Sequence, residues 1–164
     1  SKQMIGNGFL IPSGPLREKL SAISRADCVI INGNKNQELE KKIFENVNEK
    51  KLHIFYSKYK IKNIEKFRNK ELIAFAGIGN PSNFFDLLRD NNLNLKKTFS
   101  FPDHHHYSNS DFENIKKNNS SIIVTTEKDY QRLDNDQKQS CNFIEVDLEI
   151  ENKENLSKII QTYL

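Results

Sequence analysis

Three of the chain's four histidines stand together, next to a carboxylate and behind a proline, in the run Phe101-Pro102-Asp103-His104-His105-His106. An imidazole beside a carboxylate can take or share a proton near neutral pH, and imidazoles are also common metal ligands. Three adjacent histidines cannot all point in one direction, so at most two could bind one metal ion. The pattern leaves three interpretations open: an acid–base site on Asp103 and His104, a transition-metal site, and a polar turn without a function.

Two further polar clusters each follow an apolar run. The cluster Gly77-Ile78-Gly79-Asn80 comes after Leu72–Ala76, and the cluster Thr126-Glu127-Lys128-Asp129 ends the run 121–126. The first resembles part of a dinucleotide-binding fingerprint, but the third glycine is absent, and a tight strand-to-helix turn explains it without a ligand. Because carboxyl ends of parallel strands meet at one edge of a sheet, we expect these clusters and the histidine run to lie close together.

A glycine- and proline-rich loop occupies residues 6–15 and leads into Leu16-Arg17-Glu18. Its composition predicts a shaped loop rather than a helix or a central strand. The Arg17 guanidinium could bind a phosphate, and the Glu18 carboxylate could bind a cation. An exposed pair near the start of the next helix explains the same two residues without a ligand.

The elements that must position these residues alternate between strand and helix patterns. Apolar runs predict strands over 26–31, 52–61, 72–76, 95–101, 121–126 and 142–148. Helical spacing and capping signals predict helices over 37–47, from Pro81 with Asn80 as N-cap, over 110–117 with a Ser110–Glu113 capping box, from Glu127, and over 152–164. This order predicts an α/β fold, a Rossmann-like α/β/α sandwich with a mainly parallel sheet.

The composition suits a globular protein, with 36% hydrophobic and 29% charged residues. A net charge of only +3 argues against a nucleic-acid-binding role, because acidic residues accompany the basic ones along the chain. Cys28 and Cys141 lack CxxC spacing and are expected to be buried free thiols in a reducing compartment. No apolar run approaches the roughly 18 residues of a membrane span, and no signal peptide is visible.

Taken in order, the motifs resemble one enzyme family over nearly the whole chain. They are Gly6-Asn7-Gly8 with Pro12-Ser13-Gly14-Pro15-Leu16-Arg17-Glu18, Arg25-Ala26-Asp27 before Asn32-Gly33, Ala76-Gly77-Ile78-Gly79-Asn80-Pro81 with Phe84-Phe85, Phe101-Pro102-Asp103-His104-His105, and Thr126-Glu127-Lys128-Asp129. Together they resemble the lipid A tetraacyldisaccharide 4'-kinases, which phosphorylate a lipid A precursor at the inner membrane of Gram-negative bacteria.

The resemblance implies a P-loop-type kinase of two α/β/α domains joined by a β-ribbon, using ATP and Mg²⁺ at the cytoplasmic surface of the inner membrane. It divides this chain into the tail of the P-loop domain (1–50), a ribbon or linker (51–70) and a Rossmann-like domain (71–164). It implies catalytic roles for His104 and Asp103, with the histidine partnering an aspartate of the N-terminal domain. Arg17 and Glu18 would face the nucleotide and metal, with Glu18 as a Mg²⁺ ligand. Gly77, Asn80, Glu127 and Lys128 would have further roles in the site.

The chain departs from the family pattern because it contains no GxxxxGK[ST] loop to hold the phosphates. We therefore expect it to be a fragment, a split-gene product or a truncated remnant that is inactive without an N-terminal P-loop segment. We also expect residues 1–33 to pack poorly without the rest of their sheet. One alternative is a non-catalytic Rossmann-like binding module. Another is an Asp-His-His metal-dependent phosphoesterase, which the lone Asp134-Asn135-Asp136 pair disfavours.

Overall fold

The computed structural model describes residues 5–47, 52–117 and 120–163, and the chain divides into two compact units. The first unit comprises Ser1–Lys58 and Leu148–Leu164, and the second comprises Tyr59–Asp147. This division differs from the predicted ranges, because the closing segment of the chain groups with the first unit rather than with the Rossmann-like domain. Two strands, β2 (His53–Ile61) and β7 (Val146–Ile150), contain the two points at which the chain passes between units.

The second unit is built on a four-stranded parallel sheet in the order β4-β3-β5-β6. Its strands are β3 (Glu71–Ala76), β4 (Asn94–Ser100), β5 (Ile122–Thr126) and β6 (Asn142–Ile144). Its helices are α2 (Pro81–Asp90), α3 (Asn109–Lys116), α4 (Glu127–Gln131) and α5 (Asn135–Gln139), with a short 3₁₀ helix at Ile64–Lys66. The predicted α/β fold with a mainly parallel sheet is confirmed.

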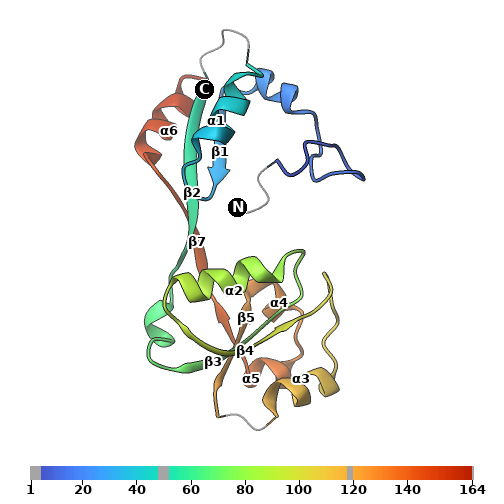
Figure 1. Ribbon diagram of the computed structural model, residues 1–164. Helices are drawn as coiled ribbons and strands as arrows, with labels where there is room; N and C mark the ends of the chain where they lie inside the picture. The colour runs from blue at the N-terminus through green and yellow to red at the C-terminus, as the bar shows by residue number, and fades with distance from the viewer. Residues whose placement is uncertain (1–4, 48–51, 118–119, 164) are drawn as a thin grey trace. The chain divides into compact units, whose positions relative to one another are not determined.

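Helices cover both faces of this sheet, with α2 on one face and α3 and α5 on the other (Figure 1). Alternate side chains of the central strand β3 point to opposite faces. Leu72, Ala74 and Ala76 pack in the cluster that contains Phe84, Phe85 and Leu88 of α2. Ile73 and Phe75 pack in a second cluster, with Phe112 and Ile115 of α3. Because β3 is apolar on both faces, it can only be a central strand of a three-layer unit.

The carboxyl ends of β3, β4 and β5 lie at the same edge of the sheet of the second unit. Phe75 of β3 is in register with Phe99 of β4 on one side and with Thr125 of β5 on the other. The chain leaves β3 toward β4 and then crosses back to β5, so the strand order reverses between β3 and β5. In open parallel sheets, ligands bind in the crevice beyond such a reversal point.

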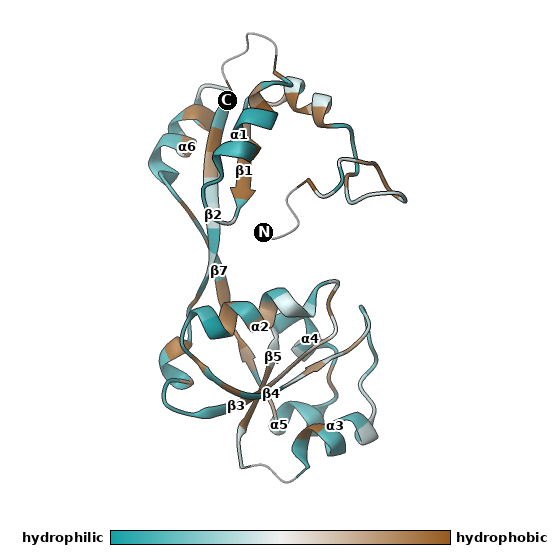
Figure 2. Ribbon diagram, in the orientation of Figure 1, coloured by the Kyte–Doolittle hydropathy of each residue, from teal (hydrophilic) through white to brown (hydrophobic). Residues whose placement is uncertain are grey.

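The first unit contains β1 (Cys28–Asn32), which pairs in parallel with β2, and the sheet order is β1-β2-β7. Its helices are a 3₁₀ helix at Leu20–Arg25, α1 (Gln37–Phe44) and α6 (Lys153–Gln161). Figure 2 shows the apolar character of β1, yet Ile30 in its middle is 45% exposed. Between residues 5 and 33 no side chain is buried, which agrees with the expectation of poor packing there. Residues 1–4 of that prediction lie outside the described residues.

The capping prediction for the third helix was wrong by two residues. Ser108, not Ser110, is the N-cap, and its hydroxyl accepts a hydrogen bond from the Asp111 amide. The Asp111 carboxylate in turn accepts from the Ser108 amide, which completes the capping box. Aspartate at the third helical position reaches the N-cap amide as glutamate does in the usual motif, so Glu113 has no part in this cap.

Further features of the structure differ from what the sequence predicts. The run 142–148 forms two strands rather than one, because the Asn63 side chain donates to the Phe143 carbonyl and accepts from the Glu145 amide between them. Helix α5 was not predicted, since its five residues are too few for a periodic pattern.

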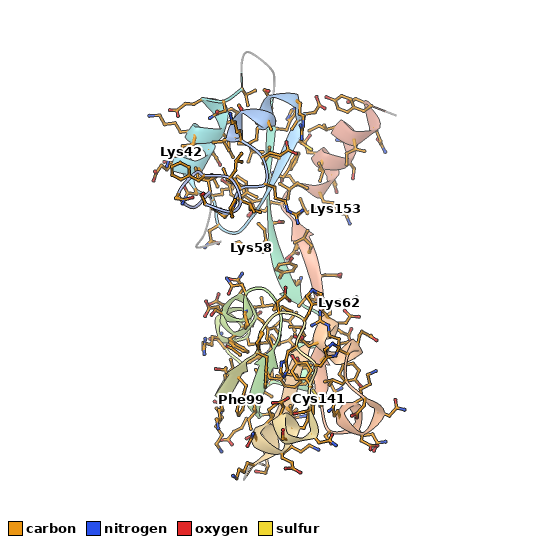
Figure 3. The ribbon with its side chains drawn as sticks, turned by 90° about the vertical axis from the view of Figure 1, so that its right-hand side faces the viewer. Lys42, Lys58, Lys62, Phe99, Cys141 and Lys153 are labelled. Atoms are coloured by element: carbon orange, nitrogen blue, oxygen red, sulfur yellow. The ribbon has the colours of Figure 1, made fainter. Side chains whose placement is uncertain are left out.

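Of the two cysteines that were predicted to be buried, only Cys141 is buried, and Cys28 is half-buried. Burial raises the pKa of the Cys141 thiol to about 12. Figure 3 shows Cys141 and Phe99 within the second unit.

Within the residues that the structure describes, none of the helices combines the length and the apolar character that crossing a bilayer requires.

Lys62, which is labelled in Figure 3, follows the end of β2. Its amide donates to the Glu145 carbonyl at 2.9 Å. Its ammonium group lies 3.7 Å from the Asp147 carboxylate. These contacts bring the two ends of the second unit together.

Candidate functional site

The three polar clusters that follow β3, β4 and β5 meet at Gly77. The Gly77 amide donates to Asp129 Oδ2 at 3.0 Å, and its carbonyl accepts from the His104 amide at 3.1 Å and from Arg132 Nη1 at 3.2 Å. A Cβ atom on Gly77 would lie 2.7 Å from the Tyr107 hydroxyl and 3.1 Å from the Pro102 carbonyl oxygen. Only glycine permits this close approach of the three loops.

Asp129 is the buried centre of this arrangement, with no exposed surface. Its carboxylate accepts from the Gly77 amide, from the Thr126 hydroxyl at 2.7 Å and from Arg132 Nη1 at 3.2 Å. Burial of Tyr107 and the nearby Asp129 charge raise the pKa of the Tyr107 phenol above its ordinary value. A buried carboxylate with three donors holds neighbouring loops in a fixed geometry.

His104 lies at the exposed carboxyl edge of the sheet, as the acid–base interpretation requires. Its side chain is 70% exposed, and its backbone is left-handed with φ of +61°. The His104 amide donates to Asp103 Oδ1 at 3.0 Å, while His104 Nε2 lies 3.9 Å from Asp103 Oδ2. Arg132 Nη2 lies 3.2 Å from His104 Nδ1. The ring is therefore held from one side and open to solvent on the other.

His105 has a different environment from His104. Its ring stacks on Phe101 with 4.7 Å between centroids, and its Nε2 lies 3.1 Å from Asp111 Oδ2. Because the two adjacent rings contact Arg132 and Asp111 respectively, they diverge from one another. Among the described residues, no group of three or more histidine, cysteine, aspartate or glutamate side chains could hold a metal ion. The transition-metal interpretation thus gains no support from this arrangement.

The Asp111 carboxylate should make the second unit sensitive to acid. The Ser108 amide and hydroxyl together with His105 hold the pKa of Asp111 below its ordinary value. A carboxylate whose pKa is lowered by folding stabilises the folded protein. This stabilisation is fully present above the pKa of the unfolded chain, about 3.9, and is lost as the pH falls through the pKa of the folded protein. We expect Asp111→Asn to cost about 1 kcal/mol at pH 7, because it removes a negative charge from the first turn of α3 and weakens the capping box, and progressively less at acid pH.

Urea unfolding of both proteins at a series of pH values between neutrality and acid would measure this difference. The matched control is Asp90→Asn, which alters an exposed carboxylate of the same unit. A destabilisation by Asp111→Asn that stays constant down to the most acidic pH would contradict the prediction.

Three of the remaining candidate residues line a cavity of about 700 Å³ within the second unit. Asn80 belongs to the loop after β3, whereas Glu127 and Lys128 begin the helix after β5. Ile78, Phe84 and Leu87 contribute apolar walls. The cavity therefore lies at the point where the strand order reverses, and it combines an apolar lining with polar groups.

Arg17 and Glu18 belong to the first unit, and both are exposed. Glu18 Oε2 accepts from Arg25 Nη2 at 2.6 Å. The structure thus places the predicted site residues in two groups. Asp103, His104, Gly77, Asn80, Glu127 and Lys128 lie in the second unit, and Arg17 and Glu18 lie in the first.

Sequence reasoning missed Arg132 and gave Asp129 no individual role. The signal that could have found Arg132 is its spacing, because residues three apart on a helical turn lie on the same side. The side chain of an arginine three residues after the aspartate of Thr126-Glu127-Lys128-Asp129 can reach back to that carboxylate. In the structure, Arg132 Nη1 donates to Asp129 Oδ1 at 3.2 Å.

Comparisons with known proteins agree with these motifs. The family model described as tetraacyldisaccharide-1-P 4'-kinase matches residues 1–164. A tetraacyldisaccharide 4'-kinase of Pelagibacter ubique is 38% identical over 93% of this chain and 50% of its own length. The enzyme of Haemophilus influenzae is 33% identical over 92% of this chain and 43% of its own length.

A solved structure is also similar. The LpxK of Aquifex aeolicus, described as an "apo" form in complex with ATP, matches with a TM-score of 0.60 and 28% identity, over 93% of this chain and 47% of that one. The present chain spans about half the length of the curated relatives that it matches. With the family model covering every residue, this chain belongs to the tetraacyldisaccharide-1-P 4'-kinase family.

Proposed function

We propose that this chain supplies one half of a tetraacyldisaccharide 4'-kinase. In this reaction the 4'-hydroxyl oxygen of tetraacyldisaccharide 1-phosphate attacks the γ-phosphorus of ATP, the bond to ADP breaks, and the hydroxyl proton passes to a base. The observation that carries the proposal is the meeting of three family motifs at Gly77, with the His104 ring exposed at the carboxyl edge of the sheet.

The residues of the second unit have separate roles in this proposal. His104 and Asp103 face the sugar hydroxyl, while Asp129 and Arg132 hold the loops that carry them. Asn80, Glu127 and Lys128 contact substrate from the rim of the cavity. Phosphoryl transfer depends on positioning and on neutralising charge, so a rigid frame around one exposed imidazole suits it.

ATP and Mg²⁺ require groups beyond those of this chain. The 164 residues contain no GxxxxGK[ST] sequence, so a P-loop segment must hold the β- and γ-phosphates. Arg17 faces the nucleotide, and Glu18 offers one carboxylate to Mg²⁺, which prefers oxygen ligands and keeps several waters and phosphate oxygens. The acceptor is a membrane lipid, so we place the reaction at the cytoplasmic surface of the inner membrane.

An assay of phosphate transfer from labelled ATP to tetraacyldisaccharide 1-phosphate in detergent would test this function. The 164-residue chain should show no transfer alone. It should transfer phosphate when co-purified with the half of the Pelagibacter ubique relative that it does not match, which would supply the P-loop segment. Transfer by the chain alone would contradict the need for a P-loop segment. A folded, co-purified pair that binds ATP and transfers nothing would favour the non-catalytic binding module instead.

A further inference from the structure

Arg132 connects the buried part of the site with the exposed histidine. It follows α4, and its side chain is only 19% exposed. Nη1 donates to the Gly77 carbonyl and to Asp129 Oδ1, both at 3.2 Å, while Nη2 lies 3.2 Å from His104 Nδ1. One guanidinium group therefore contacts residues of all three loops at the carboxyl edge.

The contact with His104 bears on which ring nitrogen carries the proton. A guanidinium group has five N–H donors and no acceptor, so the nitrogen it contacts must offer a lone pair. The contact is a hydrogen bond only when His104 Nδ1 is unprotonated, which in the neutral ring places the proton on Nε2. The Asp103 carboxylate, an acceptor, lies on the Nε2 side at 3.9 Å. Both charged neighbours thus favour the same tautomer.

The position of the guanidinium group is itself fixed. Asp129 cannot move toward solvent without breaking its bonds to the Gly77 amide and the Thr126 hydroxyl. The His104 backbone is held to the same glycine through the bond from its amide to the Gly77 carbonyl. Charge-assisted bonds of this kind are stronger than neutral ones, so the ring and the guanidinium group keep their relative orientation.

We propose that Arg132 is a positioning residue that holds His104 in the Nε2–H tautomer, so that the exposed edge of the ring presents a hydrogen-bond donor. His104 would then donate to an oxygen of the substrate or of a neighbouring carboxylate and would not itself accept the hydroxyl proton. This consequence for catalysis rests on the proposed kinase function, whereas the tautomer rests on the contacts that His104 makes with Arg132 and Asp103.

The test is long-range ¹H–¹⁵N correlation NMR on the 164-residue chain with ¹⁵N-labelled histidine, without nucleotide or lipid. At alkaline pH the ring is neutral, and the two nitrogens have distinct shifts when one tautomer dominates. We expect His104 to show a protonated Nε2 and an unprotonated Nδ1, with less averaging between tautomers than the exposed His106. The substitution His104→Gln would assign its signals by their loss.

The substitution Arg132→Met removes the donors and should move the His104 nitrogen shifts toward those of His106. Arg132→Lys, which restores one donor group, should move them back toward the original values. His106 shifts should stay unchanged in every variant. A proton on His104 Nδ1 in the unsubstituted chain would overturn the proposal, even if Arg132→Met failed to fold. Unchanged His104 shifts in a folded Arg132→Met variant would overturn it as well.

Discussion

The substitution Asp129→Ala is expected to lower the free energy of unfolding of the second unit by about 3 kcal/mol. It leaves the Gly77 amide and the Thr126 hydroxyl without their acceptor and removes the carboxylate partner of Arg132. Breaking a buried ion pair by removing one partner costs about 3 to 5 kcal/mol, and we take the lower end because Arg132 is 19% exposed.

Native-state hydrogen exchange would measure this loss residue by residue. The Gly77 amide should exchange roughly a hundredfold faster in the variant, since each 1.4 kcal/mol is worth a factor of ten. Glu113→Ala, on the exposed face of α3, is the matched control and should leave these rates nearly unchanged. Equal Gly77 exchange in Asp129→Ala and in the unsubstituted chain would show that this network does not stabilise the unit.

The substitution His104→Ala is expected to lower kcat of the assembled kinase by about 10²- to 10³-fold, the usual loss when one preorganised hydrogen-bond donor is removed. The ring is exposed, so little stability should be lost with it. His104→Gln should retain more activity than His104→Ala, because its amide nitrogen can take the place of the Nε2–H donor.

Single-turnover assays with the co-purified P-loop half would separate this effect from substrate binding. The control is His106→Ala, which removes an exposed imidazole two residues away. A kcat that is the same for His104→Ala and His106→Ala would remove His104 from the reaction. Equal losses in His104→Ala and His104→Gln would argue that the ring accepts a proton rather than donating one.

Much of the second unit could be predicted because its sequence signals are local. Glu71–Ala76 is an unbroken apolar run after its first residue, and Pro81 is the first residue of α2, as predicted. Parallel strands place their carboxyl ends together, so the meeting of the loops at Gly77, Asp103–His104 and Thr126–Asp129 followed from the order of the elements.

What could not be predicted depends on contacts between distant residues. The break between β6 and β7 is made by Asn63, which lies far away in sequence and bonds to Phe143 and Glu145. The contact between Arg132 and His104 joins two loops that only the fold brings together. A helix of five residues such as α5 is fixed by its capping residues more than by periodicity.

The hydrogen bond between the Lys62 amide and the Glu145 carbonyl has a consequence for the history and engineering of the chain. Since Tyr59–Asp147 enters and leaves at one place, it has the topology of an inserted domain, and such insertions are tolerated when the two ends lie close together. Evolution could acquire or exchange this segment without severing the surrounding unit. Excision of Tyr59–Asp147 would cut β2 after Lys58 and β7 before Leu148, so a linker between these two residues would have to replace the ends of both strands.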